Sequence, residues 1–242
     1  MDRSSSAVRA GIVWSVLGAE LDRRESAADV LDVGGGSGVL AVPLAERGCA
    51  VTVVDTSADA LATLRRRAAE AGVADRVRGL QGDVDGLLDL VEPAGYDLVL
   101  CHSVLEFVDD PTVAVEILAG AMRPGGAVSL LVANRAAAVL ARALGGHLAD
   151  AHRALSRGDG RWGAADGVQR RFDAEALAAL LNPAGLQVES VHGVRVFADL
   201  VPGAVLDRES GALEELRLLE AAASALPPYR DIAAQLHVLA RR

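Results

Sequence analysis

The sequence predicts an α/β fold, a doubly wound and mostly parallel seven-stranded sheet with an N-terminal helix and an inserted lid. Short apolar runs alternate with helical segments, which is typical of a parallel sheet with helices on both faces. A glycine-rich turn directly follows the first apolar run. The length of 242 residues suits one large α/β domain, so we expect a single domain over residues 1–242.

The first predicted element is a helical segment over residues 1–27. Its apolar stretch, residues 12–17, is too short to span a bilayer, and charged residues follow it closely. We therefore expect a cytoplasmic protein without a membrane partner.

Five strands are expected after this segment, separated by helical or turn-rich stretches. They are predicted at residues 28–33, 50–54, 77–81, 96–101 and 127–133. A helix after the glycine turn is expected to end at Gly48. Another is predicted over residues 58–71, where Leu61, Leu64 and Ala68 share one face.

The regular pattern breaks after Asn134. Residues 134–172 are rich in Ala, Gly, Arg and His, with a helix expected over residues 135–144. The pattern resumes with helices at residues 173–181 and 212–225 and strands at residues 186–196 and 235–240, which complete the sheet. We interpret residues 134–172 as a lid or substrate-binding insertion within the domain.

The composition excludes several chemistries. All 24 basic residues are arginine, and against 33 acidic residues they give a net charge of −9. Without lysine, a Schiff base and a phosphate-loop lysine are impossible. Two cysteines, Cys49 and Cys101, are too few for a disulfide framework or a zinc cluster, so we expect a reducing compartment and no metal. Positive charge is concentrated in residues 150–171, with five arginines against three aspartates.

The glycine turn predicts a nucleotide-type ligand. Gly34, Gly36 and Gly38 follow a strand and precede a helix, so the chain can turn tightly and a ligand can approach the main-chain N–H groups. The acidic residue Asp55 closes the next strand, where a carboxylate can accept hydrogen bonds from ribose hydroxyls. These features fit either a dinucleotide or S-adenosylmethionine.

The glycine spacing separates these two ligands. A dinucleotide fingerprint requires a third glycine at the position of Val39, whereas this chain has G-x-G-x-G preceded by Asp32. Asp83 follows the third strand, and residues 123–126, Arg-Pro-Gly-Gly, precede the fifth. In these motifs the chain resembles the class I methyltransferases, which implies a Rossmann-like fold and S-adenosyl-L-methionine as the cofactor.

A closer resemblance extends from about Arg9 to Arg241 and is weakest over residues 135–172. The segments that carry it are Arg9 with residues 12–14, the triple glycine, residues 102–108, residues 193–197, Pro228-Tyr229 and His237-Val238. In these segments the chain is similar to the tRNA 5-carboxymethoxyuridine methyltransferase family. This resemblance implies methylation of the carboxylate of 5-carboxymethoxyuridine at the tRNA wobble position, and hence the tRNA anticodon region as partner.

The resemblance also implies a set of cofactor-binding residues. Those carried over from the family are Arg9, Gly34, Gly35, Asp55, Val84, Asp85 and His102, and the motifs add Asp32, Gly36, Gly38 and Asp83. Arg9 has a physical reason, since a guanidinium pairs bidentately with a carboxylate such as that of the cofactor. His102 is interpreted as an orienting contact with the cofactor.

No catalytic residue is expected for this chemistry. A carboxylate with a reference pKa of about 4 is ionised at neutral pH, so no general base is required and alignment drives the transfer. We predict that Arg195 contacts the substrate carboxylate and that Tyr229 faces the same pocket. Three alternatives stay open: a small-molecule O- or N-methyltransferase, a cofactor-binding module without catalysis, and a nicotinamide enzyme.

Overall fold

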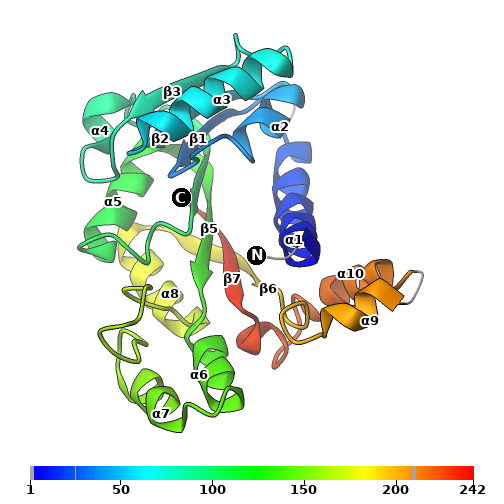
Figure 1. Ribbon diagram of the computed structural model, residues 1–242. Helices are drawn as coiled ribbons and strands as arrows, with labels where there is room; N and C mark the ends of the chain where they lie inside the picture. The colour runs from blue at the N-terminus through cyan, green and yellow to red at the C-terminus, as the bar shows by residue number, and fades with distance from the viewer. Residues whose placement is uncertain (1–2, 25, 209–210) are drawn as a thin grey trace. The chain divides into compact units, whose positions relative to one another are not determined.

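The computed structural model describes residues 3–24, 26–208 and 211–242, and the side chains of residues 11–24, 26–206 and 211–242. The strands are β1 Asp29–Val33, β2 Ala50–Asp55, β3 Val77–Gln81, β4 Tyr96–His102, β5 Met122–Ala133, β6 Gln187–Val194 and β7 Gln235–Arg241. The helices are α1 Arg3–Asp22, α2 Ala41–Glu46, α3 Ala58–Glu70, α4 Leu87–Leu90, α5 Pro111–Ala121, α6 Arg135–Leu144, α7 Leu148–Ser156, α8 Ala174–Leu181, α9 Gly203–Arg208 and α10 Ala212–Ala223 (Figure 1).

The described strands form one sheet of seven, in the order β3-β2-β1-β4-β5-β7-β6. β1 is parallel to β2 and to β4, and β2 is parallel to β3. β7 runs antiparallel to β5, because Arg242 exchanges backbone hydrogen bonds with the beginning of β5 while the Asn134 N–H, just after β5, donates to the Ala234 carbonyl before β7. The predicted doubly wound, mostly parallel sheet is confirmed. Its order reverses between β1 and β4, the place where such sheets bind ligands.

The chain divides into two compact units, which are described separately. The glycine-turn unit comprises the described parts of residues 20–130, 178–189 and 239–242. The helical unit comprises the described parts of residues 1–19, 131–177 and 190–238.

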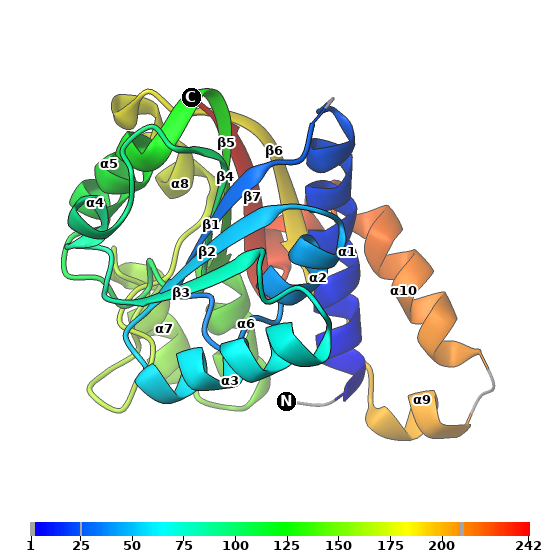
Figure 2. The same cartoon turned by 90° about the horizontal axis from the view of Figure 1, so that it is seen from above.

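The glycine-turn unit is a parallel sheet covered on both faces. α2 and α3 lie on one face of β1–β4, and α4 and α5 lie on the other (Figure 2). Leu31, Val53 and Leu98 of the central strands are fully buried. Leu61, Leu64 and Ala68 of α3 are buried as the helical spacing predicted, and the Ser57 side chain caps that helix by accepting the Ala60 N–H.

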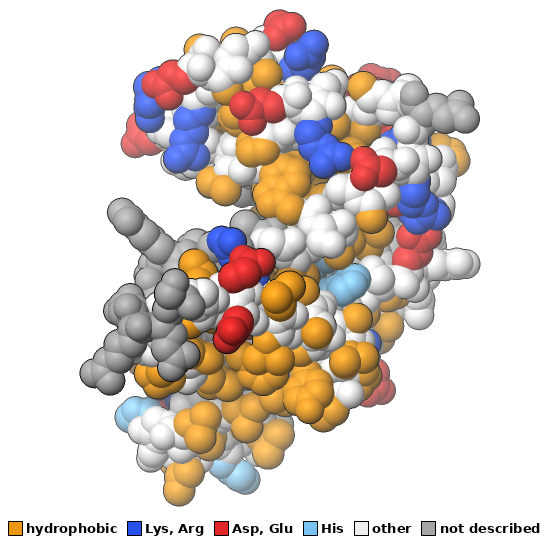
Figure 3. Space-filling view, turned by 90° about the vertical axis from the view of Figure 1, so that its right-hand side faces the viewer, with side chains coloured by type: hydrophobic (Ala, Val, Ile, Leu, Met, Phe, Trp, Pro, Cys, Tyr) orange, Lys and Arg blue, Asp and Glu red, His pale blue; other side chains and the backbone are white. Residues whose placement is uncertain are grey.

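The helical unit contains α6, α7, α9 and α10. Many of its large apolar side chains are exposed, among them Leu144, Leu148, Leu218 and Leu226. Figure 3 shows hydrophobic side chains gathered over α10 and its surroundings.

Most predicted elements are confirmed, with two differences near the turns. α2 begins only at Ala41, because residues 37–40 continue the glycine turn. β5 begins at Met122, so the Arg-Pro-Gly-Gly motif lies within the strand and pairs with the chain end through Gly125 and Gly126. Among the described residues no helix is both long enough and apolar enough to cross a membrane.

Candidate active site

A cavity of about 360 Å³ opens at the carboxyl ends of the parallel strands of the glycine-turn unit. Its walls come from the ends of β1 and β2, the segment after β3 and the segment after β4. The lining residues include Val33, Gly34, Asp55, Thr56, Gly82, Asp83, Val84, Asp85, Ser103, Val104 and Phe107. The structure therefore brings together five predicted cofactor-binding residues: Gly34, Asp55, Asp83, Val84 and Asp85.

The glycine turn forms a cradle that side chains would fill. Gly34 has a φ of +73°, and a Cβ there would lie 2.3 Å from the Val104 Cγ2 atom. Gly38 has a φ of +78°, and a Cβ there would lie 2.2 Å from the Leu64 Cδ1 atom of α3. Glycine is required at both positions for backbone conformation and for space. Gly34 lines the cavity, whereas Gly38 packs the turn against α3.

Asp55 is held in place at the cavity wall by the backbone. One carboxylate oxygen accepts the Gly36 N–H at 2.9 Å, and the other accepts the Ser57 N–H at 2.8 Å. A carboxylate offers about four lone-pair positions, so these two bonds leave capacity for ligand hydroxyls. The geometry agrees with the ribose-binding role expected from the sequence.

Asp32 lies beneath the turn and does not line the cavity. Its side chain is buried, with 2% of the residue exposed. A Cβ on Gly35 would lie 2.4 Å from its Oδ2 atom, which has no hydrogen-bond partner among the described residues. Burial raises the pKa of Asp32 to about 7, and repulsion from Asp55 adds to this effect. Asp32 is thus a buried acidic group next to Gly35 of the glycine turn.

Asp83, Val84 and Asp85 form the wall that follows β3. The Asp83 carboxylate accepts the Gly86 N–H at 3.1 Å, which closes a turn and fixes this segment. Val84 is buried beside it. Both aspartates considered in the sequence are therefore present in one wall.

His102 ends β4, and its Nε2 atom lies 2.9 Å from the Ser129 hydroxyl of β5. Ser129 is fully buried, so the imidazole is fixed against the neighbouring strand. His102 is not among the residues that line the cavity. The orienting contact with the cofactor expected from the sequence stays a prediction. The Arg9 side chain lies outside the described residues.

The two predicted substrate residues belong to the helical unit. Arg195 follows β6 in a left-handed conformation with φ of +62°, which is uncommon for a residue other than glycine. Its side chain is 14% exposed, and its guanidinium lies 3.6 Å from the Asp199 carboxylate. Its Nε atom is buried without a hydrogen-bond partner in the described part of the chain. Tyr229 is 46% exposed, and its ring contacts that of Phe197, with centroids 6.0 Å apart.

A buried glutamate that the sequence reasoning missed fixes the segment after Arg195. Glu220 of α10 is 1% exposed, and its carboxylate accepts the N–H groups of Val196, Phe197 and Ala198 at 2.7–2.8 Å. Three hydrogen bonds to one side chain hold this backbone firmly. No local sequence signal marks Glu220, because it reads as an ordinary polar residue of an amphipathic helix.

Most charged side chains of residues 150–171 form ion pairs with one another. Three of its five arginines pair with its three aspartates: Arg153 with Asp150, Arg157 with Asp159, and Arg171 with Asp166. Because the arginines exceed the aspartates by two, these pairs leave the segment with the net charge of +2 expected from the residue count.

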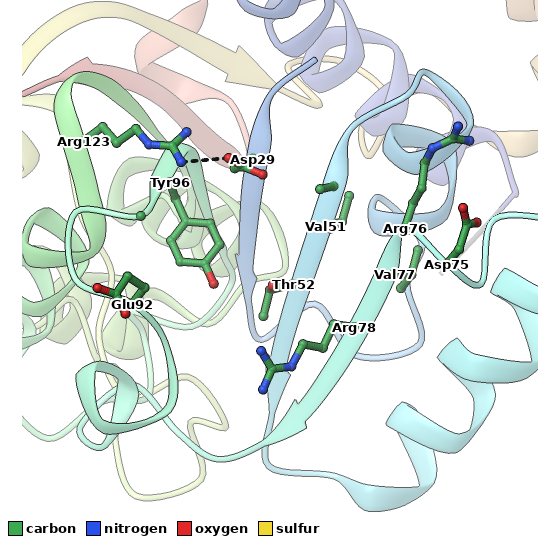
Figure 4. A pocket seen from close by; sticks show the side chains of 12 residues that line it. Asp29, Val51, Thr52, Asp75, Arg76, Val77, Arg78, Glu92, Tyr96 and Arg123 are labelled. Carbon is green, nitrogen blue, oxygen red and sulfur yellow. Dashed lines mark hydrogen bonds and ion pairs between the residues drawn. The ribbon is translucent and has the colours of Figure 1, made fainter. Parts of the chain in front are cut away.

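A second cavity, of about 400 Å³, lies at the amino ends of β1–β4 and is lined by charged side chains (Figure 4). Arg123 joins two strands there, donating to Asp29 at 2.8 Å and to Asp97 at 2.7 Å. Parallel sheets bind ligands at the carboxyl ends of their strands. We therefore assign this charged cluster to holding the strands together.

Comparison with known proteins agrees with this geometry. A family model described as a methyltransferase domain matches residues 14–191. The tRNA 5-carboxymethoxyuridine methyltransferase of Escherichia coli strain K12 is 30% identical over 213 residues, 88% of this chain and 79% of the relative. A ubiquinone biosynthesis O-methyltransferase of Xanthomonas euvesicatoria is 36% identical over 170 residues, 69% of this chain and 66% of the relative.

A solved structure shares the fold. An S-adenosylmethionine-dependent methyltransferase from Mesorhizobium loti superposes with a TM-score of 0.63 at 23% identity, covering 95% of this chain and 97% of that one. The domain match spans most of the chain, and the glycine cradle at the carboxyl ends of the strands fits the cofactor that this family uses. The chain therefore belongs to the class I S-adenosylmethionine-dependent methyltransferases, with S-adenosyl-L-methionine as its cofactor.

Proposed function

We propose that this enzyme methylates the carboxylate of 5-carboxymethoxyuridine at the wobble position of tRNA, forming the methyl ester. The observation that carries the proposal is the extent of the similarity to the Escherichia coli enzyme, 213 residues or 88% of the chain. That length exceeds the span of the domain match, residues 14–191, so it includes sequence outside the common domain. Substrate choice in a shared fold depends on such added parts. The enzyme would act in the cytoplasm on the anticodon region of tRNA.

The cavity residues would hold the cofactor. Gly34 lines the cavity and, with Gly35 and Gly36 of the same turn, would let the main chain approach the cofactor. Asp55 would accept the ribose hydroxyls, and Asp83 to Asp85 would surround the adenine. Gly38 packs the turn against α3, the buried Asp32 lies next to Gly35, and His102 would make an orienting contact with the cofactor. Arg9 would pair with the cofactor carboxylate. When bound, the cofactor supplies an electrophilic methyl group carried on a sulfonium.

The chain needs no proton acceptor for this reaction. The substrate carboxylate, with an ordinary pKa of about 4, is already ionised at neutral pH. The role of the protein is then to hold an oxygen of that carboxylate in line with the methyl group, and such positioning can contribute about 7 to 11 kcal/mol.

Arg195 is the residue that we propose to hold the carboxylate. Its Nε atom is buried and lacks a hydrogen-bond partner within the described residues, and a buried unsatisfied N–H group is costly. Its ion pair with Asp199 is long, 3.6 Å, and Asp199 is itself exposed. A substrate carboxylate would satisfy the guanidinium better than this partner does. Glu220 keeps the following backbone fixed, and Tyr229 would border the same site.

Two substitutions of Arg195 separate the guanidinium from its backbone. Arg195→Ala removes the guanidinium and leaves a non-glycine residue at the unfavourable φ of +62°. Arg195→Gly removes the guanidinium and also relieves the backbone strain, because glycine adopts a positive φ readily. We expect both variants to bind S-adenosylhomocysteine normally and to methylate tRNA at least tenfold more slowly, because a lost charged hydrogen bond is worth about 1.5 to 3 kcal/mol. Full activity in the glycine variant would show that the guanidinium has no role.

The proposed reaction is tested with radiolabelled S-adenosylmethionine and bulk tRNA, followed by digestion to nucleosides. We expect label in a uridine derivative, and we expect mild alkali to release it, because an ester hydrolyses where a methyl group on nitrogen or carbon does not. Alkali-stable label in tRNA, or no label in tRNA, would contradict the proposal.

A second candidate is an O-methyltransferase acting on a small molecule. It is favoured by the higher identity, 36%, to the ubiquinone biosynthesis O-methyltransferase, over a shorter stretch of 170 residues. The same assay separates the two, since label found only in small extractable metabolites would support this second function.

A further inference from the structure

A cavity of about 360 Å³ lies in the helical unit, at the beginning of α6 and beside the loop that follows α7. We propose that this cavity is a stacking slot for an unpaired nucleobase of the tRNA anticodon loop. The inference rests on the proposed function. The slot is lined chiefly by Ala137, Ala138, Ala141, Arg142, His147 and Trp162. Its volume is at the small end of the range for ligand pockets, which suits a single flat ring.

One wall of the slot is kept free of bulky side chains. Ala137, Ala138 and Ala141 share one face of α6 because of their helical spacing. α6 is anchored at its start by Asn134, whose side-chain oxygen caps the Ala136 N–H while its side-chain nitrogen donates to the carbonyls of Asp231 and Ala233. The side-chain hydrogen bonds of Asn134 therefore hold the fold. Such a surface of small side chains can pack against a flat ring.

The lining also contains a cation stacked on an aromatic ring. The Arg142 guanidinium carbon lies 3.8 Å from the centre of a Trp162 ring, and that of Arg171 lies 4.2 Å from it. Arg142 also approaches Asp150, but at 3.9 Å, the outer limit of an ion pair. A guanidinium stacked on an indole offers a nucleobase both a flat surface and a positive charge.

The loop is built to hold Trp162 in this position. The buried Arg171 donates to both oxygens of Asp166, at 2.7 and 3.0 Å. Asp166 in turn accepts the backbone N–H of Trp162 at 3.3 Å, and Arg153 donates to the backbone carbonyl of Trp162 at 2.7 Å. A buried ion pair is weak evidence for stability alone. Here it fixes the backbone of a partly exposed tryptophan that lines the slot.

Shape and charge together select the ligand class. The slot combines a smooth wall with a stacked cation, which fits a ring joined to an anionic group, as in a nucleotide. A base from the single-stranded anticodon loop can be splayed into such a slot, whereas a base in a duplex cannot.

Binding of an anticodon stem-loop RNA tests the slot. We expect Trp162→Ala and Arg142→Ala each to weaken binding about tenfold, within the usual range for loss of one stacked base. Trp162→Phe, which retains a ring, should lose less and covers the case in which Trp162→Ala misfolds. Arg65→Ala on α3 is the matched control, because it removes one positive charge from an exposed site outside the helical unit. If Arg65→Ala weakened binding as much as Arg142→Ala, the effect of Arg142 would be non-specific attraction between charges, and the proposal would be overturned.

Fluorescence gives an independent measurement. The chain has two tryptophans, so Trp14→Phe leaves Trp162 as the sole indole. We expect its emission to change on RNA binding and to saturate with the affinity measured by anisotropy. RNA that binds and is methylated with no change in Trp162 emission, and with an unaltered KM in Trp162→Ala, would overturn the slot and leave the proposed function intact. Wild-type enzyme that neither binds nor methylates the RNA would overturn both.

Discussion

The substitution Asp32→Asn tests whether the buried acid behind the glycine turn costs stability. Burial raises the pKa of Asp32 from 3.8 to about 7 in the folded protein. The folded state then holds this proton more tightly than the unfolded chain, so it loses stability as the pH rises from about 4 through 7. The full difference corresponds to about 4 kcal/mol, because one pKa unit is worth about 1.4 kcal/mol.

The asparagine variant should lack this pH dependence. Between pH 5 and pH 8, we expect the free energy of unfolding of Asp32→Asn to rise relative to the wild type by about 2 to 3 kcal/mol. Urea denaturation followed by circular dichroism at both pH values measures this change. Any fixed cost of the added amide group cancels in the comparison. A difference between variant and wild type that does not change with pH would refute the reasoning.

A second aspartate provides the control for this experiment. Arg157 lowers the pKa of Asp159 to about 2, so its carboxylate is ionised in both the folded and unfolded states between pH 5 and pH 8. The unfolding free energy of Asp159→Asn relative to the wild type should therefore be constant over this range.

Asp32 should also couple cofactor binding to pH. S-adenosylmethionine carries a positive sulfonium that S-adenosylhomocysteine lacks, and a nearby positive charge favours an ionised carboxylate. We expect the preference of the wild type for S-adenosylmethionine over S-adenosylhomocysteine to increase from pH 6 to pH 8, measured by calorimetry. Asp32→Asn should remove this increase, and an identical increase in the variant would contradict the coupling.

Two further substitutions test the supports of the site. Gly34→Ala places a Cβ 2.3 Å from Val104 at a φ of +73°, so it should destabilise the fold by about 1 to 3 kcal/mol and abolish the thermal shift produced by S-adenosylhomocysteine; adding Val104→Ala should restore part of the stability only. Glu220→Gln weakens the acceptor of three buried N–H groups, so chemical denaturation should show a loss of about 1 to 3 kcal/mol with cofactor affinity retained.

The cofactor cavity could be predicted from sequence because its signals are local. The glycine turn, Asp55 and the Asp83 to Asp85 segment each lie at the end of a predicted strand, and parallel topology brings such ends together. Glu220 and the Trp162 loop could not be found in this way. Their roles depend on contacts between elements distant in the sequence, such as the carboxylate of α10 and the backbone after β6.

The arginines of residues 150–171 also bear on RNA recognition. Three arginines of residues 150–171 are paired with aspartates of the same segment, so they neutralise few phosphates. If the protein made only one or two phosphate contacts to the single-stranded anticodon loop, the slope of log K against log salt concentration would be about −0.7 to −1.4. A slope of this size is consistent with recognition through Arg195 and the stacking slot. A much steeper slope would place the main binding energy in the phosphate backbone, which the paired arginines of this segment do not favour.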